Sequence, residues 1–431
     1  MKNVGLISLG CSKNLVDSEN ILGLLSKDHF NIATNIEEAD IIIINTCGFI
    51  ESSKKESIDT IFDTLKYGKK VVVTGCLVER YYHELRHEMP EVDLFIPIRD
   101  YYRFNALLSS VCEDVKDKKA GVTDEYRIVS TGDFSAYLKI GEGCSNRCAY
   151  CAIPIIRGDF VSRAPESIIK EANKLAKAGY KELVVLQQDT TKYGIDLNNP
   201  EINIVYLLNE LLKVKTLDYI RLLYLYPDEI TDELIDLIAS EPRLTPYFDI
   251  PIQHSEDKIL EAMNRRGNKE FLRNLFKKIR QKCPNAILRT TVMVGFPGET
   301  DEDFNGLLDF IKEIEFDHLG CFTYSREENT PAFNYLDQID EDVKQDRLDK
   351  VMKLQQNISY RRNKNHTGEE MEGLVVGKDH DYYCLRSYWN APDDVDGKIL
   401  FKSEKELKLG DKVKVKINSA FVYDLLGELV L

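Results

Sequence analysis

Short apolar runs alternate with amphipathic stretches along the first quarter of the chain. The runs NVGLISLG, ADIIIINT, KKVVVTG and VDLFIPI end at Gly10, Thr46, Gly75 and Ile98, and helical patterns such as ESSKKESIDTIFDTLK lie between them. Continuous apolar strands that alternate with helices are typical of a parallel sheet covered on both faces. The pattern therefore predicts an N-terminal domain over residues 1–115, built on a doubly wound parallel sheet.

The same alternation restarts near residue 130 with a longer period. Six further apolar runs are separated by helical patterns such as PESIIKEANKLAKAG, and six βα units are fewer than the eight of a complete barrel. We therefore predict a partial (β/α)6 barrel over residues 130–364, with its active face at the carboxyl ends of the strands. The six runs are AYLKIGEG, ELVVLQQDT, YIRLLYLYP, YFDIPIQ, ILRTTVMVGF and HLGCFTYS.

A helical pattern and a set of short strand patterns complete the chain. Residues 341–365 have a helical period, with apolar residues near one face at Val343, Leu348, Val351, Met352 and Ile358. Five short strand patterns follow within residues 365–431, and so many strands in so short a segment predict a small OB-like five-stranded β-barrel. The five patterns are EMEGLVVG, DYYCLRS, GKILF, DKVKVKINSA and FVYDLLGELV.

The composition indicates a globular protein of the cytoplasm. Hydrophobic residues make up 43% of the chain, and its start, MKNVGLISLG, lacks the regions of a signal peptide. The longest apolar run, around IIIIN, is too short to cross a bilayer, so we expect no membrane contact. The net charge of −15 disfavours non-specific attraction to nucleic acid. In a reducing compartment the ten cysteines suit metal ligation or burial better than disulfides.

Three cysteines directly follow three predicted strands. Cys11, Cys47 and Cys76 each come after a strand and ahead of a predicted helix, where the helix dipole favours a thiolate. Because the carboxyl ends of parallel strands border one crevice, we expect the three thiols to converge there. The alternative is that they are buried small hydrophobic residues. We expect burial for the remaining cysteines, Cys112, Cys283, Cys321 and Cys384.

Three more cysteines fall in the loop after the first strand of the predicted barrel. Cys144, Cys148 and Cys151 have the spacing C-x3-C-x2-C. Structural zinc takes four ligands, so three close cysteines do not complete a zinc site. They suit a 4Fe–4S cluster, whose irons favour thiolates, and leave the fourth iron open to a ligand.

This spacing, with Tyr150 before the last cysteine, resembles the radical S-adenosylmethionine (SAM) superfamily. The stretches SLGCSKNLVDSE, EGCSNRCAYCAIPIIRGDFVSR and VGFPGETDEDF resemble one of its families, the methylthiotransferases. The resemblance implies two 4Fe–4S clusters, one on each cysteine triplet, and two roles for SAM: methyl donor and source of a 5′-deoxyadenosyl radical. It also implies a sulfur carried on the N-terminal auxiliary cluster, and a reductant such as flavodoxin or ferredoxin.

Four further stretches are similar to the RimO type within that family: GCSKNLVDSE, QQDTTKYG, FDIPIQHSEDKILEAMNRRG and LRSYWNAPDDVDG. This type methylthiolates the β-carbon of an aspartate in ribosomal protein S12, so the resemblance implies S12 or the small ribosomal subunit as partner and no nucleic acid as direct substrate. The alternatives are a tRNA adenosine methylthiotransferase and a non-catalytic iron–sulfur protein that docks on ribosomes. In YSREENTPA, Asn329 stands where the family usually has glycine, and asparagine tolerates a positive φ.

Candidate SAM contacts lie beside the cysteine loop and after the second strand of the barrel. Tyr150 could lie against the adenine, and Gln188 and Asp189 follow that strand, where a polar contact is expected. The alternative for the latter two is ordinary solvation of a strand end. His254 in PIQHS is expected to be a hydrogen-bonded structural histidine in preference to a base.

The last domain resembles a TRAM domain, which in this family grips the substrate. Over residues 365–431 it has 13 acidic and 9 basic side chains, a net charge of −4, which fits a basic protein better than RNA. The three lysines of KVKVK lie on one strand face, as a local basic stripe or as a solvated edge. Trp389 is either an exposed anchor for the substrate or a core residue of the small barrel. The predicted substrate contacts are Trp389, Asp393, Asp394 and Asp396.

Overall fold

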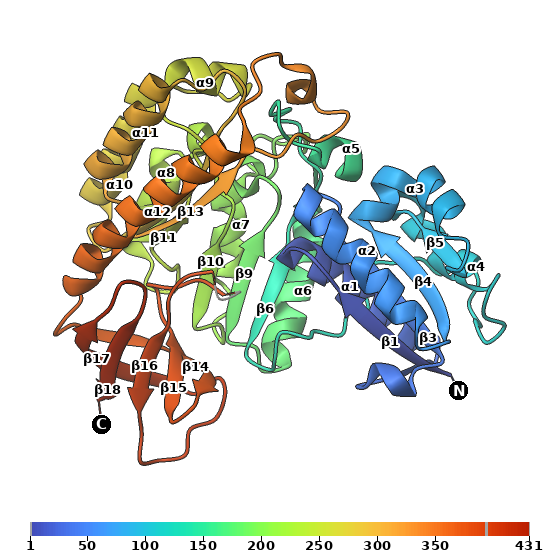
Figure 1. The fold of residues 1–431 in the computed structure, drawn as a ribbon. Coiled ribbons are helices and arrows are strands. Elements are labelled where there is room, and N and C mark those ends of the chain that lie inside the picture. Colours follow the sequence, from blue (N-terminus) through green and yellow to red (C-terminus); the bar gives the residue numbers. More distant parts are fainter. Residues whose placement is uncertain (1, 393–394, 431) are drawn as a thin grey trace. The chain divides into compact units, whose positions relative to one another are not determined.

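The computed structural model describes residues 2–392 and 395–430 (Figure 1). Within these residues the chain divides into two compact units. The first unit contains the residues up to Gly132 together with Glu142–Ser145 and Cys151–Val161. The second contains Asp133–Gly141, Asn146–Tyr150 and the residues from Ser162 onward. The three domain boundaries drawn from the sequence stay a prediction.

The first unit is built on a five-stranded parallel sheet in the order β2-β1-β3-β4-β5. Strand β3 alternates its side chains between two cores. Ile41 and Ile43 pack in one core with α1 and α4, and Ile42 and Ile44 pack in the other with α2 and α3. The predicted doubly wound sheet is therefore confirmed. The elements are β1 (Asn3–Ser8), α1 (Ser12–Lys27), β2 (Asn31–Ile32), β3 (Ile41–Thr46), α2 (Glu51–Leu65), β4 (Lys70–Gly75), α3 (Cys76–Glu88), β5 (Leu94–Ile96) and α4 (Phe104–Leu108).

The second unit contains six parallel strands in chain order. They form two three-stranded sheets, β6-β9-β10 and β11-β12-β13, which a parallel bridge between Ile220 and Leu244 links. The amide of Leu225 also donates to the carbonyl of Asp249 (2.9 Å) across this junction. The predicted partial barrel of six βα units is confirmed. Its strands are β6 (Ser135–Lys139), β9 (Glu182–Leu186), β10 (Tyr219–Leu222), β11 (Tyr247–Asp249), β12 (Ile287–Val294) and β13 (His318–Thr323).

Helices cover these six strands. Each of the six strands is followed by at least one of them before the next strand of the six, and α11 begins with a capping box between Thr300 and Asp303. No helix within residues 2–392 and 395–430 combines the length and the apolar character that crossing a membrane requires. The main helices of the unit are α6 (Pro165–Lys177), α7 (Ile204–Leu211), α8 (Asp232–Ser240), α9 (Asp257–Ala262), α10 (Lys269–Lys282), α11 (Asp301–Ile314) and α12 (Glu341–Lys364).

Helix α12 buries a face that is largely polar. Val343, predicted on the apolar face, is 39% exposed, so that part of the prediction is wrong. The buried face begins one residue later, because long polar side chains there reach backbone carbonyls and carboxylates of the barrel. Arg347 pairs with Glu299 (2.9 Å), for example. The buried residues of α12 are Lys344, Arg347, Val351, Gln355, Ile358, Ser359 and Asn363.

The C-terminal strands close into a five-stranded barrel in the order β14-β15-β16-β18-β17, as predicted. Bulges between Val375 and Gly377 and between Ile417 and Ser419 bend two of these strands. Figure 1 shows this barrel in the red part of the chain. Its strands are β14 (Glu370–Asp379), β15 (Tyr382–Arg386), β16 (Ile399–Lys402), β17 (Lys412–Ala420) and β18 (Leu425–Leu429).

Candidate iron–sulfur sites

The structure brings Cys11, Cys47 and Cys76 together at one edge of the N-terminal sheet. Cys11 precedes α1, Cys47 follows β3, and Cys76 is the first residue of α3, directly after β4. Gly10, at φ +87°, allows the first loop to approach the second closely. A Cβ on Gly10 would lie 2.8 Å from the Cβ of Cys47 and 3.0 Å from its Sγ.

The three thiols also influence one another electrostatically. The pKa of Cys76 is raised to about 11, mainly by burial and also by negative charge on Cys11 and Cys47, although Arg157 lowers it in part. Burial likewise raises the pKa of Cys47, and Cys11 adds to the effect. Cys47 and Cys76 are therefore not free thiolates, in spite of the helix dipole. A metal that coordinates these sulfurs would displace their protons.

Helix α1 supports this edge with buried polar side chains that sequence reasoning missed. Asn14 donates to the carbonyl of Leu9 (2.6 Å), and Asn45 donates to the carbonyl of Asn14 (2.8 Å), so the loops after β1 and β3 are tied together. Glu19 accepts from Arg127 (2.8 Å) and Ser130 (2.6 Å), which holds the segment that leaves this unit. The signal in the sequence was the polar run SKNLVDSEN inside an otherwise apolar helix face.

The second cysteine triplet lies in the loop closed at its base by the short strands β7 (Gly141–Glu142) and β8 (Val161–Ser162). The amide of Cys144 donates to the carbonyl of Gly158 (3.2 Å). Gly143, at φ +70°, is required at its position, because a Cβ there would lie 2.0 Å from the carbonyl oxygen of Asp159. Cys144 and Cys151 are partly exposed.

Cys148, which belongs to the second unit, is buried. Its Sγ lies 4.0 Å from the hydroxyl of Tyr226 and 3.8 Å from Nη1 of Arg265. Arg265 also donates to the hydroxyl of Tyr150 (3.2 Å), whose ring packs beside Met263. An aromatic side chain, Tyr226, and a cationic one, Arg265, therefore lie close to this sulfur.

Asp189 orients the cysteine loop. Its carboxylate accepts from the side-chain amide of Asn146 (2.7 Å) and from the hydroxyl of Thr191 (2.6 Å), and Lys192 donates to the carbonyl oxygen of the Asn146 side chain (2.5 Å). Gln188 is half-buried beside it. Contact of Tyr150, Gln188 and Asp189 with SAM stays a prediction.

Gln187 is a candidate that sequence reasoning missed. It follows β9, is fully buried, and neither atom of its side-chain amide has a hydrogen-bond partner among the described residues. Its amide fits against Gly141, where a Cβ would lie 2.4 Å from Nε2 of Gln187. A buried unpaired amide costs about 1–3 kcal/mol, so Gln187 suits a ligand with a polar group at this strand end.

His254 has the structural role expected of it. Its Nδ1 accepts from the amide of Glu256 (3.1 Å), so its proton lies on Nε2, which faces Glu299 Oε1 (3.2 Å). Among the described residues, no group of three or more His, Cys, Asp or Glu side chains is arranged around a point for a single metal ion. Each triplet offers thiols, which is the donor set that an iron–sulfur cluster prefers.

Three family descriptions match successive parts of the chain. Residues 3–97 match the "Uncharacterized protein family UPF0004", residues 138–311 the "Radical SAM superfamily", and residues 367–430 the "TRAM domain". A protein of Alkaliphilus oremlandii, named ribosomal protein uS12 methylthiotransferase RimO, is 46% identical to this chain over 99% of each. The protein of that name in Clostridioides difficile is 46% identical over 100% of this chain and 99% of its own. This chain belongs to the RimO family of radical SAM methylthiotransferases.

Solved structures share the fold of this RimO family member. The radical S-adenosylmethionine methyltransferase TsrM from Kitasatospora setae aligns with a TM-score of 0.57 and 14% identity over 77% of each chain. The cobalamin-dependent S-adenosylmethionine radical enzyme OxsB aligns with a TM-score of 0.52 and 12% identity, over 83% of this chain and 56% of its own. At these identities the likeness extends to the fold alone. The RimO family membership establishes the chain as a radical SAM methylthiotransferase.

The asparagine that departs from the family pattern behaves as expected. Asn329 has a φ of +65°, the conformation that glycine adopts without strain. Of the four remaining cysteines, Cys112 and Cys283 are buried, whereas Cys321 and Cys384 are partly exposed, which corrects the expectation that all four are core residues.

The C-terminal residues predicted to bind substrate require correction. Trp389 is completely buried, so it is the core residue and not the exposed anchor. The side chain of Asp396 is also buried, and it accepts from the hydroxyl of Tyr247 (2.6 Å) and the amide of Ala391 (2.8 Å). Trp389 and Asp396 hold the small barrel against the other strands of the second unit. Asp393 and Asp394 lie outside the described residues.

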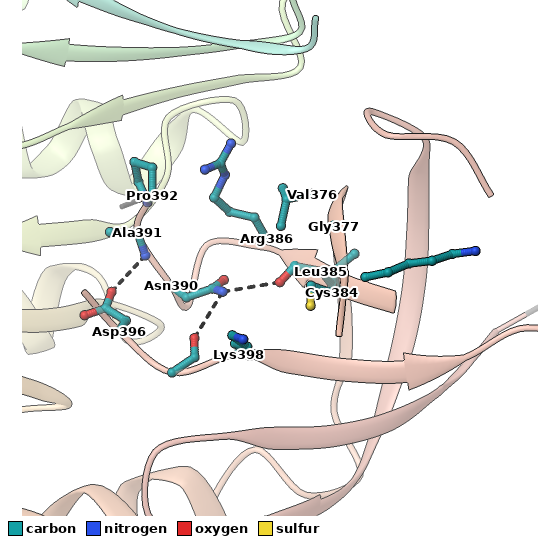
Figure 2. A pocket seen from close by; sticks show the side chains of 12 residues that line it. Val376, Gly377, Cys384, Leu385, Arg386, Asn390, Ala391, Pro392, Asp396 and Lys398 are labelled. Carbon is teal, nitrogen blue, oxygen red and sulfur yellow. Dashed lines mark hydrogen bonds between the residues drawn. The ribbon is translucent and has the colours of Figure 1, made fainter. Parts of the chain in front are cut away.

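A small pocket lies beside this segment (Figure 2). It has a volume of about 190 Å³. Asn390 forms part of its wall and donates hydrogen bonds to the carbonyls of Leu385 (3.3 Å) and Gly397 (3.4 Å). Two of the cations that line it already have acidic partners. Arg386 faces Glu182 (2.9 Å), and Lys398 faces Asp379 (2.8 Å). The charges of Arg386 and Lys398 are therefore already compensated.

Proposed function

We propose that this chain methylthiolates the β-carbon of an aspartate in ribosomal protein uS12, with two 4Fe–4S clusters and SAM as cofactors. The observation that carries the proposal is the presence of two separate cysteine triplets in a chain 46% identical over its full length to proteins named uS12 methylthiotransferases. A reductant such as flavodoxin or ferredoxin, and the cytoplasm as location, stay predictions.

Each triplet leaves one corner of its cluster without a protein ligand. Cys144, Cys148 and Cys151 would hold the cluster that binds SAM, and this cluster supplies the electron that cleaves SAM. Cys11, Cys47 and Cys76 would hold the auxiliary cluster that carries sulfur. The buried thiols among them exclude water, and their protons leave when iron binds.

Side chains around the second triplet would orient SAM. Gln187 has an unpaired amide at the end of β9, and Tyr150 supplies an aromatic face beside the cysteine loop. Asp189 acts through Asn146, by fixing the loop that carries the cysteines. These residues would bind and orient SAM. They would take no part in removing hydrogen from the unactivated carbon, which requires the 5′-deoxyadenosyl radical.

Iron content tests the two-cluster part. Reconstituted protein is expected to contain about eight irons, and replacing Cys11, Cys47 and Cys76 together by alanine is expected to leave about four. That variant should still cleave SAM to 5′-deoxyadenosine, whereas the matched replacement of Cys144, Cys148 and Cys151 should not. Full iron content in the first variant would refute the auxiliary cluster.

Mass spectrometry tests the substrate. uS12 from cells that lack this protein is expected to miss one methylthio group on an aspartate, and restoring the gene should restore it. tRNA from the same cells is the control and should be unchanged. A methylthio group lost from tRNA adenosine, with uS12 unaltered, would refute the proposed substrate in favour of tRNA.

A further inference from the structure

Each cysteine triplet has a buried arginine close to one of its sulfurs. Nη2 of Arg157 lies 3.3 Å from Sγ of Cys76, and Nη1 of Arg265 lies 3.8 Å from Sγ of Cys148. Both arginines are 8% exposed. A guanidinium is always protonated and has only donors, so each of them presents N–H groups and a fixed positive charge to a sulfur.

Acidic and amide groups hold Arg157 in place. Its Nη1 donates to Asp17 (2.5 Å) and faces Glu142 (3.3 Å), and its Nη2 donates to the side-chain oxygen of Asn14 (2.9 Å). Asp17 is itself 6% exposed, so its charge compensates that of Arg157 inside the protein. Arg157 therefore still donates a hydrogen bond to Cys76, but Asp17 compensates much of its positive charge.

Neutral groups hold Arg265. It donates to the carbonyl of Pro251 (2.6 Å) and to the hydroxyl of Tyr150 (3.2 Å), and its guanidinium lies over the ring of Tyr226 (4.3 Å to the centroid). The positive charge near Cys148 is therefore less compensated than the charge near Cys76. In a low-dielectric interior this difference is large, because charges there are weakly screened.

We propose that Arg157 and Arg265 are positioning residues that set the reduction potentials of the two clusters independently, Arg157 through Cys76 and Arg265 through Cys148. The inference rests on the two clusters of the proposed function. Reduction adds negative charge to a cluster, and hydrogen bonds and positive charge at its sulfurs stabilise the reduced form. The less compensated Arg265 has the larger effect, and it acts on the cluster that passes an electron to SAM.

Redox titration of single-cluster proteins tests the assignment. Arg157→Gln is made where Cys144, Cys148 and Cys151 are alanine, and Arg265→Gln where Cys11, Cys47 and Cys76 are alanine, so that each electron paramagnetic resonance signal comes from one cluster. Removal of Arg265 is expected to lower the ratio of reduced to oxidised cluster at fixed potential about tenfold, which corresponds to ~59 mV for one electron. Removal of Arg157 should lower the same ratio for its own cluster by less.

The two substitutions are each other's controls in the full-length protein. Each should shift one signal and leave the other at its wild-type potential. Because Arg157→Gln removes the guanidinium that pairs with the buried Asp17, the double variant Asp17→Asn, Arg157→Gln keeps the test open if the single variant fails to fold. Eight irons with both potentials unmoved would refute the role of the arginines alone. About four irons in the wild-type protein would instead refute the two-cluster proposal.

Discussion

Glu182 is a buried residue that joins the small barrel to the other strands of the second unit. Its carboxylate faces Nε of Arg221 (3.3 Å) and Nη2 of Arg386 (2.9 Å), and Arg221 also donates to the carbonyl of Ser387 (2.6 Å). Removing one member of such a buried pair leaves an uncompensated charge, which costs about 3–5 kcal/mol. The charge of the Glu182 carboxylate therefore contributes to the stability of this junction.

The pH dependence of the free energy of unfolding should reveal the contribution of the Glu182 carboxylate. Burial alone would raise the pKa of Glu182, but Arg386 and Arg221 outweigh it and hold the pKa below its usual 4.5. A carboxyl with a depressed pKa contributes stability that is complete above its unfolded pKa and is lost as pH falls through the folded value. Below about pH 4.5 the wild type should lose stability more steeply than Glu182→Gln, measured by denaturant unfolding. Equal pH slopes for the two proteins would contradict the assignment.

Truncation of Trp389 should act on folding. Trp389→Ala is expected to cost about 3–5 kcal/mol in the free energy of unfolding, because the side chain is completely buried. Leu409→Ala is the control; this residue is 62% exposed, and its truncation should stay within about 0.5 kcal/mol. If Trp389→Ala cost as little as the control, Trp389 would not be a core residue.

Single residues also mark the limit of what the sequence could predict. The positive φ of Asn329 was predictable, because it replaces a family glycine. The burial of Trp389 was not, because an isolated tryptophan in a loop has no period to assign it to a face. The contact of Asp17 with Arg157 spans 140 positions, and no local pattern reports a partner so distant.

At the scale of elements, strand ends and glycine turns place the cysteines. Strands with a clear apolar run were predicted, whereas β2 has two residues and carries no pattern to recognise. The loop that carries the second cysteine triplet depends on the backbone geometry of two of its glycines. Gly143 and Gly158 have nearly the same positive φ, +70° and +73°, but only Gly143 faces a close backbone atom.

These two glycines form a matched pair for mutagenesis. Gly143→Ala is expected to displace the loop, because the new Cβ would meet the carbonyl of Asp159 at 2.0 Å, and the protein should lose about half of its iron. Gly158→Ala meets no atom within 4 Å and should cost only the strain of its φ and ψ (+73° and −166°), about 1–3 kcal/mol, with iron retained. Iron analysis after reconstitution distinguishes them. Equal iron in both variants would show that the clash at Gly143 is relieved without displacing Cys144.

At the scale of the whole molecule, negative charge predominates. The chain has a net charge of −15, and two lysines of the KVKVK stretch are paired across strands: Lys412 with Glu372 (2.9 Å) and Lys414 with Glu370 (3.5 Å). Because β17 pairs on both sides in a closed barrel, these lysines do not protect a free sheet edge. A basic stripe for RNA, which the alternation of KVKVK allowed, is thus largely neutralised by glutamates of β14.

The association rate with the proposed substrate should therefore depend on salt. A basic ribosomal protein approaching an acidic enzyme is steered electrostatically, and screening removes that attraction. Association with purified uS12, followed by stopped-flow fluorescence, should slow on the order of tenfold between low and physiological salt. A neutral protein is the control for bulk salt effects. Tight, salt-sensitive binding of tRNA with no binding of uS12 would contradict the expectation.

The first unit is interrupted in sequence, since Cys151–Val161 belongs to it and Asp133–Gly141 does not. Translation proceeds at ~5–20 residues per second, so Arg157 is synthesised a second or more after Gly132. A nascent chain that has reached Gly132 already contains the whole N-terminal sheet, but not yet the Arg157 guanidinium that pairs with Asp17. The buried Asp17–Arg157 ion pair of the first unit can therefore form only after the ribosome has begun to translate the second unit.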